Sequence, residues 1–569
     1  MFRAAVTVSI KGVNLSRPKA GSDYCHGPQS YDSFWPLTQG SSLVEKTHQS
    51  VLNKFPEMAR IVREYGDLPL QDYAESFFRY RAQSIQPRDD FIEVVSGYAR
   101  RLLGGETAAL LERHFSDTPV ALTANHHGVD YKSLTVHGTI IFALPKLLDS
   151  SPDSVPVVPV LAFGIVPLNN FSFPRGIILS REKEVVEQPA AKARTYRKVP
   201  VIPVKFSQTL VSVTGPITTQ MVSRALGEVE RLFAEGAILE SERKSLSALL
   251  REEYAGEEVL SLPDYSDQAV VLNRAVWKRI FAPPLRDEIP DLAYLEMERV
   301  AAALLEKDIR DADSMFHNLL FDPLLREELL HALEDQVGCW NLKKLDELSK
   351  RAAQGRPGPE DFRGCGTAFF WQVDQKGRRV PLMLTKHGSQ PALSGITAGG
   401  EISVPLTPKA LCQGLRERKL LPCLFSSFAV LAFARGIKCL GGFYQVDYLP
   451  AMQRGLLHAL ESRGFHDWAK KIALVPTANF VTGMNIALVH YPDGETASAG
   501  AIEIAAAGGL TQKNLEGIKT LTVEEANLAG LMETYPEFIG DSKPDEDWFA
   551  SLKALVLKRS GEKLVRIRL

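Results

Sequence analysis

Apolar residues recur at three- and four-residue spacing through the first part of the chain, a pattern typical of amphipathic helices. Residues 50–111 follow it, most clearly over 90–103, where a diglycine at 104–105 gives a stop signal. Residues 1–45 are rich in glycine, serine, proline and aromatic residues without periodicity. We therefore expect a loosely structured N-terminal arm followed by helices.

After residue 113 the pattern changes to short, continuous apolar runs. Residues 119–124 predict a buried strand, which a polar turn and an apolar helix over 131–148 follow. Strands that are apolar on both faces, with helices between them, are typical of a covered, mostly parallel sheet. We therefore predict an α/β fold with this sheet within residues 113–220. The further predicted strands are 155–163, 176–180, 199–206 and 209–214.

The rest of the chain divides at a linker. Glycine and proline punctuate residues 351–359 without apolar periodicity. Before the linker we predict amphipathic helices at 221–235, 241–254, 290–305 and 323–337. After it we predict strands at 367–373, 379–385, 471–475 and 484–491, and helices at 408–416 and 425–435. The chain thus divides into an N-terminal arm and helical region (1–112), an α/β sheet domain (113–220), a helical subdomain (221–350) and a second, smaller α/β or α+β domain (360–569).

Composition narrows the function classes. The 569 residues are 45% hydrophobic and 24% charged with a net charge of -2, and no basic stripe stands out, so we expect no nucleic-acid partner. Six scattered cysteines without C-x-x-C spacing do not form a disulfide framework and favour a reducing, cytoplasmic compartment. The first eleven residues lack a sustained apolar run, so export is not expected.

Two uncharged stretches are candidates for a membrane-spanning segment. Residues 154–174 contain four prolines, which exclude a regular helix. Residues 420–434 number about fifteen, fewer than the roughly 20 that a spanning helix needs. We expect no transmembrane span and a buried helix at 420–434, with peripheral membrane contact as the alternative.

The strongest candidate for chemistry is the turn Asn125-His126-His127-Gly128-Val129-Asp130. It joins the predicted strand 119–124 to a helix, and ligands of open α/β sheets gather outside the carboxyl ends of strands. Histidine acts as base, metal ligand or proton shuttle near neutral pH, and Asp130 is near enough in sequence to orient one imidazole. The structural alternative is that Asn125 or Asp130 caps the helix.

The order strand, Asn-His, Asp, helix resembles the first block of the glycerolipid acyltransferases, in which a catalytic His and Asp have four residues between them. Phe173-Pro174-Arg175-Gly176 is similar to their Phe-Pro-Glu-Gly block, and 200–204 followed by 215–217 to their closing strand and its Gly-x-Pro-Ile. The resemblance covers about residues 115–220, under a fifth of the chain. Two departures concern the catalytic pair and the phosphate site: three residues separate His126 from Asp130, and Arg175 replaces the glutamate.

The resemblance implies acyl transfer from an acyl thioester to a small polar acceptor. His126 or His127, oriented by Asp130, would take a proton from the acceptor's hydroxyl or amine, while Arg175 and Lys205 would offer positive charge to a phosphate or carboxylate. Asn169 and Asn170, in an aromatic- and proline-rich segment after a predicted strand, are further substrate-binding candidates along with Asn125.

Two other functions are compatible with the same turn. His126, His127, Asp130 and His137 lie within twelve residues, and mixed histidine and carboxylate ligands suit a divalent metal in a hydrolase. Alternatively, the chain is a non-catalytic binding or scaffold protein of a biosynthetic assembly. The stretch 441–448, a diglycine beside aromatic residues and an acid, is either a binding loop or a tight turn between a helix and a strand.

Overall fold

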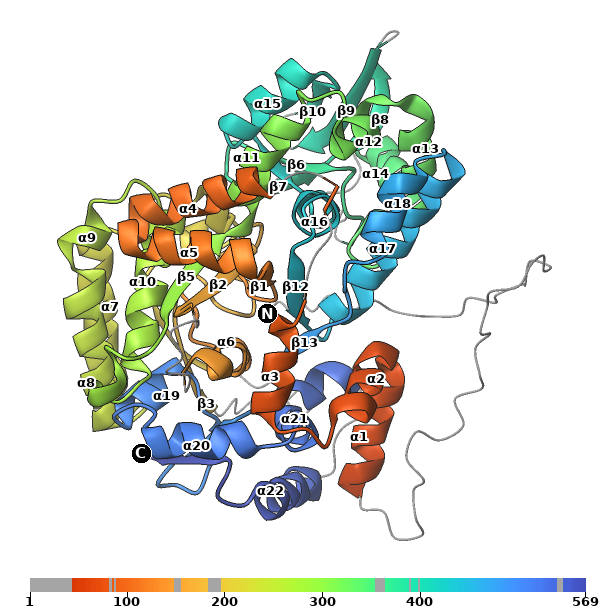
Figure 1. The fold of residues 1–569 in the computed structure, drawn as a ribbon. Helices are drawn as coiled ribbons and strands as arrows, with labels where there is room; N and C mark the ends of the chain where they lie inside the picture. Colours follow the sequence, from red (N-terminus) through yellow and green to blue (C-terminus); the bar gives the residue numbers. More distant parts are fainter. Residues whose placement is uncertain are drawn as a thin grey trace.

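The structure is a computed structural model, and Figure 1 shows a mixed α/β chain. The predicted arm at 1–45 and the linker at 351–359 lie mostly outside the described residues. The helical region between 50 and 111 is confirmed. Its helices are α1 (Leu43–Lys54), α2 (Pro56–Tyr65), α3 (Leu70–Phe78), α4 (Asp89–Leu103) and α5 (Gly105–Asp117). The structure describes residues 43–80, 84–85, 88–147, 155–182, 196–353, 364–387, 390–397, 400–539 and 546–569.

A parallel five-stranded sheet organises the molecule, in the order β13-β12-β1-β2-β5. Its strands are short, and β1 and β2 are buried along their whole length, as expected where helices cover both faces of a parallel sheet. The mostly parallel sheet predicted from the apolar runs is confirmed. Its strands are β1 (Val120–Leu122), β2 (Val157–Ala162), β5 (Asp291–Glu296), β12 (Lys438–Gly442) and β13 (Phe480–Thr482).

Alternating side chains of β1 enter two separate hydrophobic cores. Val120 and Leu122 belong to the first core, together with α6 (Ser133–Leu147) and most of α10 (Tyr265–Arg279). Ala121 belongs to the second core, together with α4, α5, α11 (Met297–Asp308) and α17 (Gln445–Ser462). Figure 1 shows α4 and α5 on one side of the sheet and α6 on the other.

The prediction that one sheet is built within residues 113–220 is wrong. Only β1 and β2 of the central sheet come from this segment; β5 comes from the predicted helical subdomain, and β12 and β13 from the C-terminal segment. The runs at 176–180 and 199–206 contribute instead to an antiparallel pair, β3 (Gly176–Glu182) and β4 (Tyr196–Pro200). Strand β4 ends at Pro200, and Pro203 follows; neither proline can donate to a ladder. The run at 209–214 holds a 3₁₀ turn, Val211–Val213.

Two further element predictions are corrected. The helix predicted over 290–305 is strand β5 followed by α11, because tertiary burial on both faces masks any strand alternation in Asp291–Glu296. The strand predicted at 471–475 is the end of α18 (His466–Ile472) and a turn, and short apolar runs do not distinguish a helix end from a strand. The remaining helices before the linker are α7 (Thr219–Ala234), α8 (Glu240–Leu249), α9 (Glu257–Leu260), α12 (Met315–Phe321), α13 (Pro323–Ala332) and α14 (Leu342–Ala353).

The C-terminal segment adds three small sheets and further helices to the central sheet. The sheets have the orders β11-β6-β7, β10-β9-β8 and β15-β14-β16. Their strands are β6 (Phe370–Val373), β7 (Arg379–Pro381), β8 (Met383–His387), β9 (Gln390–Thr397), β10 (Gly400–Pro405), β11 (Leu420–Pro422), β14 (Ala487–His490), β15 (Thr496–Ser498) and β16 (Val565–Arg568). The helices are α15 (Pro408–Arg416), α16 (Leu424–Phe428), α19 (Ala501–Ala506), α20 (Gln512–Thr520), α21 (Val523–Ile539) and α22 (Glu546–Ser560).

The apolar segment at 420–434 lies in the second core. Residues 420–422 form strand β11 instead of the predicted helix, whereas 424–433 are helical, and Phe425, Phe428 and Leu431 are fully buried there. Within the described part of the chain, no helix combines the length and the apolar character needed to cross a membrane.

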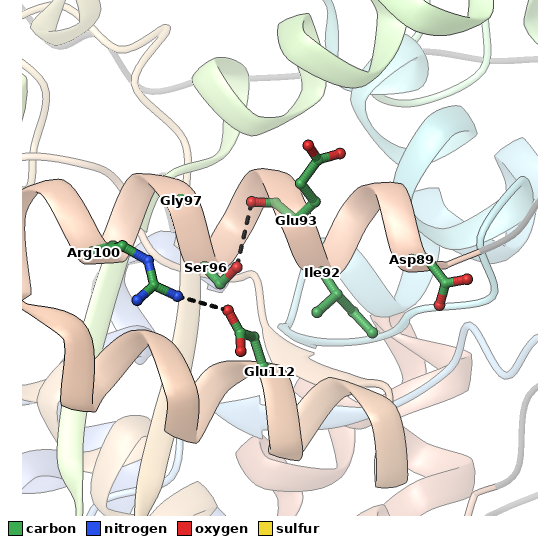
Figure 2. A pocket seen from close by; sticks show the side chains of 7 residues that line it. All are labelled: Asp89, Ile92, Glu93, Ser96, Gly97, Arg100 and Glu112. Atoms are coloured by element: carbon green, nitrogen blue, oxygen red, sulfur yellow. Dashed lines mark hydrogen bonds and ion pairs between the residues drawn. The ribbon is translucent and has the colours of Figure 1, made fainter.

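A shallow hollow lies between α4 and α5 (Figure 2). Arg100 on α4 and Glu112 on α5 form an ion pair of 2.9 Å across it, and both side chains are largely exposed. Exposed pairs of this kind contribute little to stability. None of the residues that line the hollow belongs to the histidine turn. Its lining is Asp89, Ile92, Glu93, Ser96, Gly97, Arg100 and Glu112.

Candidate active site around the histidine turn

The histidine turn, residues 125–130, lies at the carboxyl end of β1, as the sequence predicts. Backbone hydrogen bonds from His127 N to Phe163 O (2.7 Å) and from Phe163 N to Asn125 O (2.9 Å) hold it beside the loop that follows β2. Gly128 has a φ of 114°, and a Cβ there would lie 2.8 Å from the Cβ of Pro174. The turn therefore requires glycine at this position for both its backbone and its space.

The tautomer of His126 follows from its partners. The Oδ1 atom of Asn170 lies 3.0 Å from His126 Nδ1 and accepts a 3.1 Å hydrogen bond from the backbone N–H of Ser172. Because a backbone N–H only donates, this atom is the amide oxygen, and His126 Nδ1 must carry the proton. The Nε2 atom of His126 is then the unprotonated nitrogen, with a lone pair available to a substrate.

His126 is half-buried, and the ring of Phe171 meets it edge-on, with centroids 5.4 Å apart. Burial lowers the pKa of His126 to about 4, although its hydrogen bond with Asn170 acts in the opposite direction and the positive charge of Lys132 adds to the lowering. The imidazole is therefore neutral at physiological pH. A neutral histidine with a free Nε2 has the form that a general base requires.

Asp130 does not form the predicted pair with a histidine. Its Oδ1 accepts from the backbone N–H of Lys132 (3.2 Å) and from Thr135 Oγ1 (2.6 Å), at the entry to α6. Its Oδ2 lies 3.3 Å from both Asn125 Nδ2 and the hydroxyl of Tyr294. Among the described residues, no hydrogen bond joins Asp130 to either imidazole. The carboxylate instead satisfies donors at the helix start, the structural role that the sequence left as the alternative.

Burial raises the pKa of Asp130 to about 6, even though its hydrogen bonds with Thr135, Lys132 and Tyr294 favour the charged form. The hydroxyl of Tyr294 also contacts the carbonyl oxygen of His126 at 2.9 Å. Tyr294 thus connects the backbone of the histidine turn to Asp130, so the two predicted partners are linked indirectly rather than through an imidazole.

His127 is fully buried and anchors the turn instead of facing a substrate. Its Nε2 lies 3.0 Å from both the carbonyl oxygen and the hydroxyl of Ser266, and that hydroxyl donates in turn to Glu296. The guanidinium of Arg418 contacts both carboxylate oxygens of Glu296, at 2.6 and 2.8 Å. A chain of polar contacts therefore runs from the histidine turn through α10 and β5 to the loop between α15 and β11. The expectation that His127 takes part in proton transfer is not supported by this geometry.

Opposite charges are paired along this series of polar contacts. Burial alone would raise the pKa of Glu296, but the guanidinium groups of Arg418 and Arg299 outweigh it and lower that pKa to about 2. Burial lowers the pKa of His127. The series of contacts thus consists of a neutral imidazole, a hydroxyl and a buried carboxylate paired with arginine. Such a buried carboxylate is stable only while its arginine partner is present.

His137 lies in α6 away from the turn, fully buried, with Nδ1 3.1 Å from Asn485 Oδ1. It does not join His126, His127 and Asp130 in a common site. In the part of the chain that the structure describes, no group of three or more histidine, cysteine or acidic side chains is placed to hold a metal ion. The metal-site hypothesis therefore finds no ligand set in this turn.

Burial lowers the pKa of His137 to about 4, from its ordinary value of 6.5. The unfolded chain therefore binds a proton on this imidazole over a pH range in which the folded chain does not, and stability falls as the pH drops from 6.5 to 4. We expect the protonation of His137 to lower the free energy of unfolding by about 3 kcal/mol over this range. Urea unfolding at pH 7 and pH 4 measures this change. Between these two pH values His137→Gln should lose less stability than the wild type, and His331→Gln, at an exposed histidine, should lose as much as the wild type. Equal losses in all three proteins would contradict the prediction.

The predicted substrate-binding residues fall into two groups. Asn170 orients His126, whereas Asn169 is exposed and contributes a backbone N–H to Ser207 O (2.8 Å). Lys205 is exposed on the 3₁₀ turn Val204–Phe206. None of the hydrogen bonds described here places Asn169 or Lys205 against the histidine turn.

Arg175 forms part of a cationic pair that the sequence did not predict. The Arg175 guanidinium lies 4.9 Å and the Lys198 ammonium 4.8 Å from the centre of the Phe173 ring. Burial lowers the pKa of both side chains, and the charge of Arg175 lowers that of Lys198 further. Within the described part of the chain, no carboxylate pairs with either, and Arg175 donates to the carbonyl oxygen of Ile202 at 3.0 Å. Two positively charged side chains therefore lie against the same aromatic ring.

Sequence reasoning missed four residues that support the turn: Tyr294, Ser266, Glu296 and Arg418. No local motif marks them, because they lie more than a hundred positions from His127 and reach it only through the sheet. Glu296 and Tyr294 were moreover hidden in a segment predicted as a helix. Comparison of the chain with protein-family models, with curated proteins and with solved structures gives no match.

Proposed function

We propose that this chain is a transferase of the acyltransferase type, in which His126 is the general base that activates a small polar acceptor. The observation that carries the proposal is the fixed tautomer of His126, with Nδ1 bonded to Asn170 and Nε2 open at the carboxyl end of a parallel sheet. The His126 side chain is only half-buried, whereas His127 is fully buried and is not accessible to a substrate.

The proposed reaction transfers an acyl group from a thioester to a hydroxyl or amine. His126 Nε2 takes the acceptor's proton as its oxygen or nitrogen attacks the thioester carbonyl carbon. The carbon–sulfur bond then breaks, and the departing thiolate receives the proton from the imidazole. Asn170 holds the imidazole in the orientation that this transfer needs, in place of the carboxylate that the resemblance to glycerolipid acyltransferases implied.

The acceptor is proposed to carry a phosphate or carboxylate. Arg175, just after Phe171 in the chain, and Lys198 on β4 offer two positive charges without an acidic partner among the described residues. A bidentate guanidinium and a nearby ammonium are well suited to such a group.

The test is the release of free thiol from acetyl and dodecanoyl thioesters of N-acetylcysteamine, measured with phosphorylated and unphosphorylated alcohols and amines as acceptors. We expect acceptor-dependent thiol release, an acylated product in the mass spectrum, and no effect of a metal chelator. Loss of activity on chelation would favour the metal-dependent hydrolase. Thiol release no faster than in the absence of the protein would favour a binding or scaffold protein.

A further inference from the structure

Two adjoining loops beside the histidine turn present apolar side chains to solvent. Phe171, in the loop after β2, is 54% exposed. Val204 and Phe206, in the 3₁₀ turn after β4, are 69% and 36% exposed. The backbone N–H of Asn169 donates to the carbonyl oxygen of Ser207 at 2.8 Å, which joins the two loops. We call the three exposed side chains the apolar patch.

The apolar patch is held by the backbone around it. Pro203 precedes the 3₁₀ turn with a φ of -58°, the value that its ring favours, and it stiffens the chain just before Val204. Single exposed apolar residues are ordinary on protein surfaces, whereas a group of them marks a surface that contacts another molecule. The patch therefore calls for a partner that covers it.

The segments that carry the patch are positively charged. Residues 155–181 and 196–227 contain six arginines and lysines and no aspartate or glutamate, in a chain whose net charge is -2. Lys205 is exposed within the patch, and its ammonium lies 4.9 Å from the centre of the Phe206 ring. Lys198 on β4 is also exposed, and among the described residues no carboxylate pairs with either lysine.

A neighbouring turn, residues 374–379, extends this positive charge. The backbone N–H of Leu210 donates to a carbonyl oxygen of the turn at 2.9 Å, so the turn lies beside the loop that carries Lys205. Lys376 and Arg379 are both exposed there. The one acid of the turn forms an ion pair with an arginine of the same turn at 2.8 Å. The apolar patch is therefore flanked by cations that come from three separate segments of the chain.

This combination suits an anionic lipid surface. Lysine and arginine are attracted to such a surface, and exposed aliphatic and aromatic side chains bury themselves at the boundary between headgroups and acyl chains. Nucleic acid would also use the cations and would stack on the phenylalanine rings. It would leave Val204, the most exposed of the three apolar side chains, without an apolar environment.

We infer that the apolar patch and the lysines around it bind the surface of an anionic lipid bilayer, with Val204 and Phe206 inserted among the lipids. The bilayer would then lie beside His126, because Phe171 of the patch meets the His126 ring edge-on. The apolar segment 420–434, for which the sequence left peripheral membrane contact as the alternative, lies in the second core instead. The inference concerns binding alone and does not depend on the proposed function.

Co-sedimentation of the full-length protein with lipid vesicles tests the inference. The vesicles consist of phosphatidylcholine alone or of phosphatidylcholine mixed with phosphatidylserine. We expect binding to the mixed vesicles that weakens as salt is added, and much weaker binding to phosphatidylcholine alone. Val204→Ser combined with Phe206→Ser should lower the partition coefficient roughly tenfold or more. Lys205→Gln should lower it about fivefold.

Two exposed residues on other elements supply matched controls. Leu324→Ser changes a 56% exposed leucine of α13, and Lys409→Gln changes an exposed lysine of α15. Both variants should bind the mixed vesicles like the wild type. Because the changed side chains are exposed, we expect all variants to fold, and circular dichroism checks this. Val204→Ser alone, which should lose severalfold in binding, takes the place of the double variant if that protein does not fold.

Two results would overturn the inference. One is a wild type that does not bind the mixed vesicles. The other is vesicle binding that depends on Lys205 but is unchanged in the folded Val204→Ser, Phe206→Ser protein. That second result is the signature of a site for a polyanion such as nucleic acid, which uses charge without burying aliphatic side chains.

Discussion

For the proposed acyl transfer, we expect the replacement of His126 with glutamine to lower kcat/KM by roughly 10²–10⁴-fold, the usual contribution of a positioned general base. Glutamine keeps a polar side chain of similar length but cannot accept a proton at neutral pH. Steady-state thiol release from an acyl thioester measures the loss. His331→Gln, at an exposed histidine in α13, is the control and should leave kcat/KM unchanged. A folded His126→Gln protein with full activity would remove His126 from the mechanism.

The pH profile of the wild type separates His126 from Asp130 as the base. Because the pKa of His126 is lowered to about 4 and that of Asp130 is raised to about 6, kcat/KM should fall on the acid side near pH 4 if His126 accepts the proton, and near pH 6 if Asp130 does. We expect the lower value. The stability of the protein must be measured across the same pH range, because protonation of buried histidines destabilises the folded state there.

Replacing Arg418 with methionine destabilises the folded chain by about 3–5 kcal/mol, because it leaves the fully buried carboxylate of Glu296 without its main partner. Arg299, whose Nε lies 3.6 Å from the same carboxylate, should keep the loss near the lower end of that range. Urea unfolding measures the change in the free energy of unfolding.

The control for Arg418→Met is Arg416→Met, two positions earlier. Arg416 pairs with Glu306 at 2.5 Å, but its side chain is 56% exposed, so its loss should cost less than about 1 kcal/mol. Adding Glu296→Gln to Arg418→Met should restore part of the stability by removing the unpaired charge. Equal losses of stability in Arg416→Met and Arg418→Met would show that the effect of Arg418 does not come from its pairing with the buried carboxylate.

Local sequence was enough to locate the histidine turn. The strand at 120–122 and the helix at 133–147 both follow from apolar runs of the right length, and the turn between them is fixed by Gly128 and by donors at the start of α6. The α/β class followed from the same runs. The predicted pairing of a histidine with Asp130 is not observed, because this carboxylate lies close to a helix start and accepts hydrogen bonds from a backbone N–H and a hydroxyl there.

What the sequence did not predict depends on partners far along the chain. Asn170 was named as a substrate-binding residue, but its role in fixing the tautomer of His126 depends on the turn at Ser172. Arg418 reaches the histidine turn only through Glu296 and Ser266, which lie on two other elements. No pattern within a window of fifteen residues contains such contacts, so only the folded chain reveals them.

The pairing of β1 with β12 has a consequence for the order in which the protein forms during synthesis. Thr123 donates to the carbonyl oxygen of Leu440, and the two residues are 317 positions apart. A nascent chain that has emerged only as far as the linker has one edge of β1 unpaired and no strand to cover it, and exposed strand edges of this kind promote aggregation. Closing so long a loop is also slow compared with forming local helices. Strand β1, which leads into the histidine turn, therefore completes its pairing only after residue 440 has been synthesised.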